Sequence, residues 1–366
     1  MKTTKIAPII FALLFGLLFT STAHADGLAL LEDYNNKFYI FNQGTFEQIE
    51  HSKVKQYYVG EDFCVYIDYL GYMKVFYDGK WTTLSGSVET FQATEKLISW
   101  KIANYLYVWH KGFKKEISRD AKLVKMNGDI IYFEDEFDNA LKIYYKEQIY
   151  TFAENHYSLR TKALSVGRKS LGVLDGDDQL FVFDRGKMQV QKFMNNNVLF
   201  SAGSGGVVVK NIDNGELQLI TGLDVITIDY YPPEYFKTEY TWIVWQEQSG
   251  NMNYYENGQK NMLTYQRPDL LEFSPESILF ENGKRLYLHT RYNETQVCEY
   301  IPNVYAFYNE LFIYHNREQQ TIVVDNGKST TISSLPGAQF TLYYDTAVIT
   351  EGRKQSVYYN GKVYKL

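Results

Sequence analysis

The sequence is poor in the residues that build disulfide frameworks and metal centres. Its 366 residues include only 2 cysteines, 7 prolines and 6 histidines. Two cysteines are too few for a cysteine-based structural zinc site. We expect Cys64 and Cys298, each within an apolar segment, to be packed core residues rather than a disulfide. The histidines are scattered, without an HxH or HExxH pair, so the sequence indicates no metal-hydrolase motif.

The sequence also lacks an excess of positive charge and long apolar runs beyond its N-terminus. Its formal net charge is −6 at pH 7. Proteins that bind nucleic acid need a concentrated basic face, so we expect no nucleic-acid partner. No later stretch is long and apolar enough for a transmembrane helix, so we expect no integral membrane span once the N-terminal segment is removed.

The first 25 residues have the pattern of a secretory signal peptide. Lys2 and Lys5 precede an apolar run over residues 6–19, and Ala23-His24-Ala25 forms a small-residue cleavage site. An uncleaved membrane anchor is the alternative, but the run is shorter than the roughly 20 residues that a spanning helix needs. We therefore expect cleavage before Asp26 and export to the periplasm or the cell exterior. The remaining chain would carry 35 basic and 43 acidic residues.

Aromatic residues are abundant, and helical patterning is absent. The chain contains 33 tyrosines, 23 phenylalanines and 5 tryptophans. Aromatic and β-branched residues fit the pleated, half-buried surface of a sheet. No stretch after the signal peptide sustains an apolar period of 3.6 residues, so the sequence predicts an all-β protein.

A hairpin motif recurs along the chain. Met73–Gly86 predicts a strand, an Asp-Gly turn and a second strand, because both central residues of a type I′ turn need positive φ. Related segments place outer-hairpin turns near residues 44, 79, 112, 146, 186, 215, 258, 293, 327 and 361, a mean spacing of about 35 residues. Intervals of 29 and 43 residues flank the turn at 215. In this phase Asn282-Gly283 belongs to an inner hairpin.

Each unit has room for four short antiparallel strands, as in KQYYVGE, FCVYID, YMKVFYD and KWTTLS after His51. Repetition of four such strands predicts a β-propeller of about 8–10 units, with residues 26–366 as a single domain. The strand pattern and NGK-like turns resemble those of bacterial secreted β-propeller repeat proteins. This resemblance covers nearly all of residues 28–366 and implies the fold, but it assigns no functional residue. A transmembrane β-barrel is the alternative, although barrel strands are longer, at roughly 9–11 residues.

The densest carboxylate cluster is a weak candidate for a metal site. Asp175, Asp177 and Asp178 surround Gly176, but a bidentate glutamate at calcium-loop spacing is missing. A polar hairpin turn is therefore the interpretation that we favour. The sequence contains no nucleophile elbow, no phosphate loop and no identifiable pair of catalytic carboxylates. We assign no catalytic residue and no cofactor.

One stretch departs from the repeat. Asp229–Trp245 falls in the longest interval and concentrates aromatic residues around Pro232-Pro233. Insertions in repeat proteins often carry function, and exposed aromatic rings suit stacking on sugars or holding a peptide. The candidate ligand-binding residues are Tyr230, Tyr231, Tyr235, Tyr240 and Trp242. Packing between units is the simpler interpretation, above all for Trp242.

A regular repeat without a recognisable catalytic constellation favours a secreted or periplasmic, non-catalytic binding or scaffold propeller. Such a protein would present one face to a protein or glycan ligand. The alternative is a carbohydrate-active enzyme, a hydrolase or lyase with carboxylates in the central funnel, and this alternative rests on analogy between propeller folds.

Overall fold

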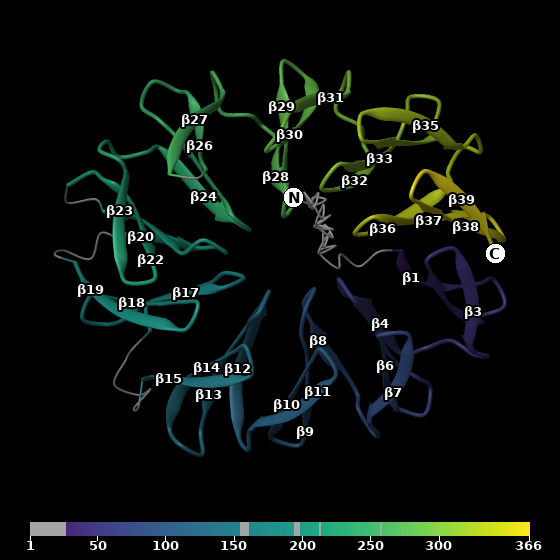
Figure 1. Cartoon of the computed structure of the whole chain (residues 1–366), viewed down its shortest axis with the longest axis horizontal. Coiled ribbons are helices and arrows are strands. Elements are labelled where there is room, and N and C mark those ends of the chain that lie inside the picture. Colours follow the sequence, from purple (N-terminus) through teal and green to yellow (C-terminus); the bar gives the residue numbers. More distant parts are fainter. Residues whose placement is uncertain (1–26, 154–160, 194–197, 212–213, 257) are drawn as a thin grey trace, which may run out of the picture.

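The computed structural model describes residues 27–153, 161–193, 198–211, 214–256 and 258–366. Their strands form ten separate antiparallel sheets, arranged as the blades of a ring (Figure 1). Nine of the described sheets have four strands and the first has three. The predicted β-propeller is therefore confirmed, with ten blades, and ten separate sheets give no support to the single closed sheet of the alternative. The predicted signal peptide lies outside the described residues.

In each four-stranded blade the strands follow one another from the centre of the ring outward (Figure 1). The first five blades consist of β1 (Leu28–Glu32), β2 (Phe38–Asn42) and β3 (Thr45–Glu50); β4 (Gln56–Val59), β5 (Phe63–Ile67), β6 (Met73–Tyr77) and β7 (Lys80–Ser85); β8 (Phe91–Ala93), β9 (Ile98–Ile102), β10 (Tyr105–His110) and β11 (Phe113–Ser118); β12 (Ala121–Asn127), β13 (Ile130–Asp135), β14 (Ala140–Tyr145) and β15 (Gln148–Ala153); and β16 (Ala163–Val166), β17 (Ser170–Leu174), β18 (Gln179–Asp184) and β19 (Lys187–Lys192).

The other five blades consist of β20 (Val198–Ala202), β21 (Val207–Asn211), β22 (Leu217–Thr221) and β23 (Asp224–Asp229); β24 (Tyr235–Glu239), β25 (Trp242–Gln246), β26 (Met252–Glu256) and β27 (Gln259–Thr264); β28 (Leu271–Phe273), β29 (Ser277–Asn282), β30 (Arg285–Thr290) and β31 (Glu294–Cys298); β32 (Tyr305–Tyr308), β33 (Leu311–His315), β34 (Thr321–Asp325) and β35 (Lys328–Ser333); and β36 (Gln339–Tyr343), β37 (Thr346–Glu351), β38 (Lys354–Tyr359) and β39 (Lys362–Lys365). The described part of the chain holds no helix long and apolar enough to cross a membrane.

Neighbouring blades pack through shared apolar clusters. In one cluster, Leu97 and Val108 of the third blade pack with Ile131 and Phe133 of the fourth. Because the second strand of a blade is covered on both faces, it reads as a continuous apolar run, and every residue of β5 is buried. Cys64 in β5 and Cys298 in β31 are buried free thiols, as the sequence predicted.

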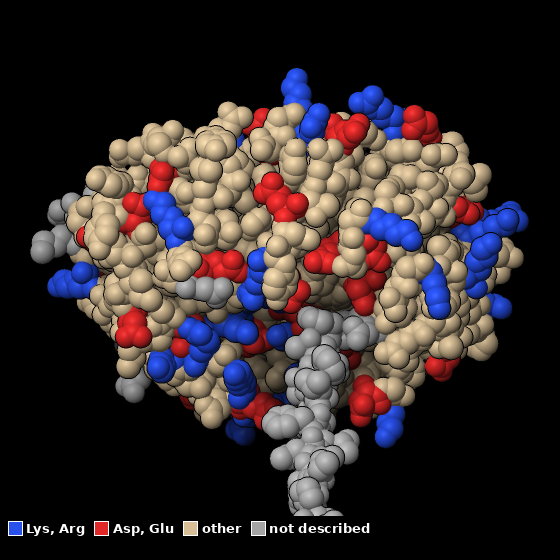
Figure 2. Space-filling model, turned by 45° about the horizontal axis from the view of Figure 1, so that its top comes forward, with Lys and Arg blue, Asp and Glu red and all other residues tan. Residues whose placement is uncertain are grey.

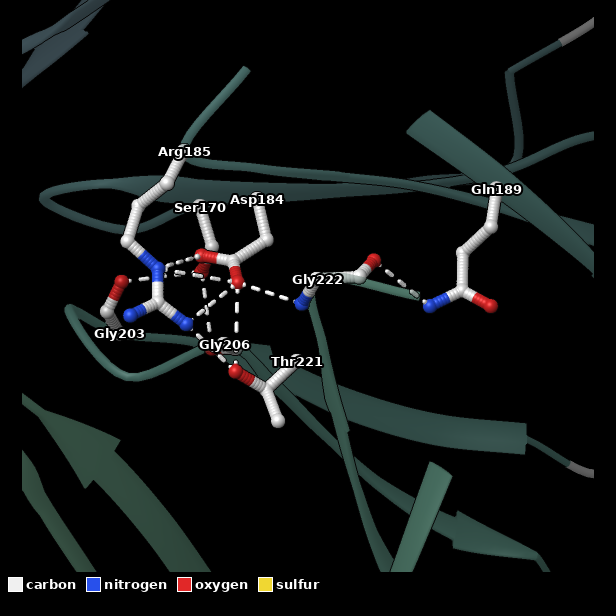
Figure 3. Close-up of polar contacts among 8 residues, drawn as sticks. All are labelled: Ser170, Asp184, Arg185, Gln189, Gly203, Gly206, Thr221 and Gly222. Carbon is white, nitrogen blue, oxygen red and sulfur yellow. Dashed lines mark hydrogen bonds and ion pairs between the residues drawn. The ribbon is translucent and has the colours of Figure 1, made fainter. Parts of the chain in front are cut away.

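Hydrogen bonds between residues one repeat apart tie the blades together (Figure 3). At the boundary between the fifth and sixth blades, the Ser170 hydroxyl lies 2.9 Å from the carbonyl oxygen of Gly203 and 2.8 Å from that of Gly206, and it can donate to either. The fully buried carboxylate of Asp184 accepts a bond of 2.7 Å from the backbone N–H of Gly222. Each blade thus satisfies polar groups of the next, which a single blade could not do alone.

The first and last blades close the ring by packing against each other. Ala29 of β1 shares an apolar cluster with Val348 of β37, the second strand of the last blade. The Gln355 amide donates to the carbonyl of Glu32 at 2.7 Å. Because β1 packs beside β37, which is the second strand of its blade, β1 is itself in the position of a second strand. Strands β1, β2 and β3 therefore correspond to the second, third and fourth strands of the other blades. The described part of the first blade therefore contains no innermost strand.

The prediction of an outer hairpin at residue 215 is wrong. Gly215 lies between β21 and β22, the second and third strands of the sixth blade. The outer turn is at Gly222, whose φ is 61°, between β22 and β23. With Gly222 the spacings from Gly186 and to Gly258 are both 36 residues, so the irregular intervals disappear. Asn214-Gly215 was assigned to the outer hairpin of this unit because Asn-Gly is a stronger turn signal than Thr221-Gly222.

Candidate functional site in the central channel

Two adjoining cavities occupy the centre of the ring, and we call them together the central channel. One has a volume of about 600 Å³ and is lined mainly by residues of β4, β32 and β36. The other has a volume of about 550 Å³ and is lined by residues at the ends of β8, β12, β16, β20 and β24. Glu95, Arg168 and Tyr240 line both cavities, so the two share one wall.

Charged side chains of several blades converge on Arg168. Its guanidinium forms an ion pair with Glu95 and lies 3.7 Å from a carboxylate oxygen of Glu61. Lys96 lies 3.8 Å from both Glu61 and Asp129. Burial raises the pKa of Glu95, and the positive charge of Arg168 opposes that rise. These contacts link the second, third, fourth and fifth blades at one end of the channel.

Tyrosine rings lie beside these charged groups and form an aromatic wall of the larger cavity. The guanidinium carbon of Arg168 lies 4.2 Å from the centre of the Tyr240 ring, within cation–π range. The rings of Tyr308 and Tyr344 meet edge to face with their centres 5.0 Å apart. Burial raises the pKa of the hydroxyls of Tyr58, Tyr240, Tyr308 and Tyr344. All four therefore stay protonated at neutral pH and can donate hydrogen bonds.

The aromatic wall lies where the first blade has no described innermost strand. There β4 of the second blade and β36 of the tenth blade both line the larger cavity. Tyr57 and Tyr58 of β4 are near enough to Tyr343 and Tyr344 to perturb their pKa values, with burial as the main cause of the rise. Two pairs of tyrosines thus span a position that a strand fills in the other blades.

Two of the channel tyrosines have a strained backbone. Tyr240 and Tyr344 are the first residues of two-residue turns between innermost and second strands, with φ of 52° and 53°. The same turn position holds Gly128 in the fourth blade, φ 53°, and Asn309 in the ninth, φ 51°. Glycine and asparagine adopt this left-handed conformation readily, whereas a bulky residue there costs of order 1–3 kcal/mol.

A second feature is an uneven distribution of exposed aromatic side chains. In a blade of antiparallel strands, the connections from the first to the second strand and from the third to the fourth lie at one end. The connections from the second to the third strand, and from the fourth strand to the next blade, lie at the other end. Eight exposed aromatic residues lie in or beside the connections of that second end, and we call them the aromatic loop face: Tyr34, Tyr69, Tyr72, Tyr105, Phe137, Tyr230, Tyr231 and Tyr265. Exposed aliphatic residues join them at Leu70, Ile301, Val304 and Leu335.

The five predicted ligand-binding residues do not form one site. Tyr230 and Tyr231 are exposed on the aromatic loop face. Tyr235 begins β24 and packs under Arg267, whose guanidinium carbon lies 4.0 Å from its ring centre. Tyr240 lines the channel. Trp242 is 2% exposed, and its indole N–H donates to the carbonyl of Ser274 at 3.0 Å, so it is a core residue.

The predicted insertion around Asp229–Trp245 is also wrong. Residues 230–234 connect β23 to β24, and this five-residue length equals that of residues 86–90 between β7 and β8. The stretch looked long only because the turn at Gly215 had been assigned to the outer hairpin. Trp245 is buried as well, and its indole N–H donates to the Asp229 carboxylate at 2.9 Å.

The weak metal candidates belong to a recurrent turn between second and third strands. The buried carboxylate of Asp175 accepts hydrogen bonds from the backbone N–H groups of Asp177 at 2.9 Å and Gln179 at 2.8 Å. Asp68 makes the same pair of bonds in the second blade, to Leu70 and Tyr72. Asp178 pairs with a lysine. Within the described ranges, no group of three or more His, Cys, Asp or Glu residues could hold a metal ion.

The charged and aromatic residues of the channel were missed by the sequence analysis, apart from Tyr240. Arg168, Glu95, Tyr308 and Tyr344 lie in separate blades. A usable signal was nevertheless present, because each lies at or next to the turn that follows an innermost strand. Alignment of the units on that turn would have collected them. The strongest turn signals in the sequence belong instead to the outer hairpins between third and fourth strands, which lie away from the channel.

Comparison with known proteins identifies the family. Residues 22–364 match the model of a 10-bladed beta propeller domain. The chain therefore belongs to this family of ten-bladed β-propeller domains, in agreement with the ten sheets of the structure. No curated protein matches the chain.

Solved structures resemble the chain only loosely. Apo AztD from Citrobacter koseri is 12% identical with a TM-score of 0.35, over 75% of this chain and 92% of AztD. The computationally designed Ika8 protein is 12% identical with a TM-score of 0.34, over 75% of this chain and 96% of Ika8. PorZ, a surface component of the type-IX secretion system of Porphyromonas gingivalis, is 9% identical with a TM-score of 0.26, over 94% of this chain and 59% of PorZ. Superpositions this loose assign no function to the chain.

Proposed function

We propose that this chain is an exported, non-catalytic binding propeller that holds a protein partner on its aromatic loop face. The observation that carries the proposal is the gathering of exposed aromatic side chains at one end of the blades. Tyrosine and tryptophan are enriched among the residues that dominate the binding energy of protein interfaces, because a rigid ring buries a large area at little entropic cost. Export rests on the signal-peptide pattern of residues 1–25.

The composition of the face favours a protein over a glycan. Aliphatic side chains such as Leu70, Val304 and Leu335 are exposed among the aromatic ones. Aliphatic groups contribute to a protein interface through burial, whereas a sugar gains little from them. The connections that carry these residues belong to most of the blades, so a partner would contact a broad area of the ring. Acidic and basic residues are interspersed on the side of the molecule drawn in Figure 2.

The test compares capture of partners by matched variants. The double variant Tyr230→Ala/Tyr231→Ala removes two exposed rings from the aromatic loop face. Tyr292→Ala is the control, since Tyr292 is 92% exposed but lies between β30 and β31, at the opposite end of the blades. Proteins from the exported fraction of the source cells would be captured on each variant and quantified by mass spectrometry.

We expect at least one protein to be captured about tenfold less by the double variant and equally by the control, since two interface rings contribute 1.4 kcal/mol or more together. Equal capture by all variants, or equal loss in the control, would contradict the proposal. Sequencing of the N-terminus of the exported protein should give Asp26 as the first residue.

A second candidate function is the carbohydrate-active enzyme, and one observation favours it. Glu61 and Glu95 approach the same guanidinium group in the channel, and the pKa of Glu95 is raised by burial. The positive charge of Arg168 holds both carboxylates in ion pairs, which argues against a free nucleophile or proton donor. Release of reducing sugar from a glycan, lost in Glu95→Gln, would establish this function in place of binding alone.

A further inference from the structure

We infer that the central channel is a second binding site, whose ligand is an uncharged oligosaccharide. This goes beyond the protein-binding role proposed for the aromatic loop face and uses different residues. The two cavities, of about 600 and 550 Å³, each lie within the roughly 300–1,000 Å³ range of small-molecule sites. Because they share the wall formed by Glu95, Arg168 and Tyr240, a ligand of several sugar units could contact both.

The two cavities of the channel have linings of different chemistry. In the larger cavity, Tyr58, Tyr308 and Tyr344 present half-buried rings and form an aromatic wall. In the smaller cavity, Asn127, Ser165 and Ser201, with backbone groups around Gly167 and Gly203, form a polar wall. A sugar ring has the same division, with C–H groups on its faces and hydroxyl groups around its edge. Its faces would stack on the tyrosine rings while its hydroxyls bond to the polar wall.

The charges of the channel indicate an uncharged ligand. Arg168 is paired with Glu95 and Glu61, and Glu239, which also lines the channel, lies 2.7 Å from Lys237. Each charge on the wall therefore already has a partner of opposite sign. A charged ligand that separated Arg168 from Glu95 would leave a largely buried charge without compensation. A saccharide needs only hydrogen-bond donors and acceptors. A guanidinium or carboxylate group in an ion pair still has N–H donors or oxygen lone pairs that the pair does not use.

The channel tyrosines have hydroxyl groups that can donate hydrogen bonds to a sugar. Because burial raises the pKa of Tyr58, Tyr308 and Tyr344, their hydroxyls remain neutral hydrogen-bond donors at physiological pH. Tyr240 and Tyr344 are also kept in left-handed turns where other blades use glycine or asparagine.

The experiment measures binding of neutral oligosaccharides to the purified protein by titration calorimetry. Cello-, malto- and chito-oligosaccharides are the probes, and sialylated and uronic-acid oligosaccharides are the charged comparison. We expect one neutral series to bind. Tyr308→Ala should weaken binding about tenfold, equivalent to 1.4 kcal/mol, and Tyr308→Phe should retain most of it because the ring is kept.

Two further variants separate this site from folding and from the aromatic loop face. Ser201→Leu would fill the smaller cavity at a half-buried residue whose hydroxyl makes only a long bond of 3.5 Å to the Thr238 carbonyl, so the blades should remain folded while binding is lost. Tyr231→Ala should leave saccharide affinity unchanged, since Tyr231 lies outside the channel.

The inference is overturned if no neutral saccharide binds at millimolar concentration, if charged glycans bind more tightly, or if folded Tyr308→Ala and Ser201→Leu bind as well as the wild type. Failure of the protein-binding proposal would instead appear as unchanged partner capture by Tyr230→Ala/Tyr231→Ala, so the two outcomes are distinguishable. Cleavage of a bound saccharide would support the site and replace the non-catalytic role.

Discussion

The guanidinium carbon of Arg168 lies 4.2 Å from the ring centre of Tyr240, although the two residues belong to the fifth and seventh blades. The same guanidinium is paired with Glu95 of the third blade. Arg168 thus contacts residues of two other blades in the wall that the two cavities share. Because Glu95 is only 8% exposed, its charge depends on this contact more than on solvent.

Removal of Arg168 should make the stability of the protein depend on pH. In Arg168→Ala the buried charge of Glu95 loses its main partner, and we expect a loss of about 3–5 kcal/mol in the free energy of unfolding at pH 7. Burial already raises the pKa of Glu95, and loss of the arginine removes the contribution that lowers it. The folded variant would then bind a proton more tightly than the unfolded chain.

Stability of Arg168→Ala should therefore rise, relative to the wild type, as the pH falls from 7 toward the ordinary glutamate pKa of about 4.3. Urea unfolding at several pH values measures this. The double variant Arg168→Ala/Glu95→Gln is the control and should lack the added pH dependence. An equal loss of stability at pH 7 and pH 5 in the single variant would show that Glu95 does not carry the effect.

The boundary between the fifth and sixth blades should depend on Asp184. Its buried carboxylate accepts hydrogen bonds from the Gly222 N–H at 2.7 Å and from the Thr221 hydroxyl at 3.3 Å, and it pairs with Arg185 at 2.8 Å (Figure 3). In Asp184→Ala these donors lose their acceptor, and we expect unfolding to require about 3 kcal/mol less. Thermal unfolding by calorimetry measures the change.

Asp224→Ala provides the matched control for Asp184→Ala, because Asp224 is an exposed residue at the start of β23 in the same blade pair. Its substitution should change the free energy of unfolding by no more than about 0.5 kcal/mol. If both variants behaved alike, the hydrogen bonds across the blade boundary would not contribute as the structure indicates.

Local signals in the sequence were sufficient to predict the fold. Asp78-Gly79 and Asn326-Gly327 identify turns whose residues need positive φ, and this requirement is a property of two or three residues. Continuous apolar runs such as Phe63–Ile67 identify strands covered on both faces. The error at Gly215 has a local origin as well, since a strong Asn-Gly signal there competes with the weaker Thr221-Gly222.

The site was harder to predict, because its residues meet only when the ring has closed. Glu95 and Arg168 are two blades apart, and Tyr58 approaches Tyr344 only because the first and tenth blades are neighbours. Aromatic density along the chain pointed instead to Tyr230–Trp242, where exposed, channel and core residues follow one another. The sequence does not show which way each ring points, since that depends on the register of β24 and β25.

The stability effects of the predicted aromatic residues should divide according to their burial. Trp242→Ala removes a ring that is 2% exposed and leaves the Ser274 carbonyl without its donor, so we expect a loss of about 3–5 kcal/mol. Tyr231 is 70% exposed, and Tyr231→Ala should change the free energy of unfolding by no more than about 0.5 kcal/mol. Guanidinium unfolding of both variants tests the assignment, and a large loss for Tyr231→Ala would show that this ring packs against the blades.

Asp229 should stabilise the protein in a way that is lost in acid. Burial by itself raises the pKa of this carboxyl group, but hydrogen bonds from Lys260 and from the Trp245 indole, each 2.9 Å, together with the backbone N–H of Tyr231, lower it to a greater extent. The folded-state pKa is therefore below the ordinary aspartate value of about 3.9. A lowered pKa stabilises the folded state at pH values above the unfolded pKa, and this contribution disappears as the pH falls through the folded one.

The wild type should therefore exceed Asp229→Asn in stability by a constant amount from pH 7 to about 5, and the difference should shrink as the pH falls below about 4. Urea unfolding from pH 7 to pH 2 measures this difference. Asp177→Asn is the control, because Asp177 is exposed and its turn is held by the Asp175 carboxylate. A difference between wild type and Asp229→Asn that stayed constant down to pH 2 would mean that folding does not lower the pKa of Asp229, and this would contradict the prediction.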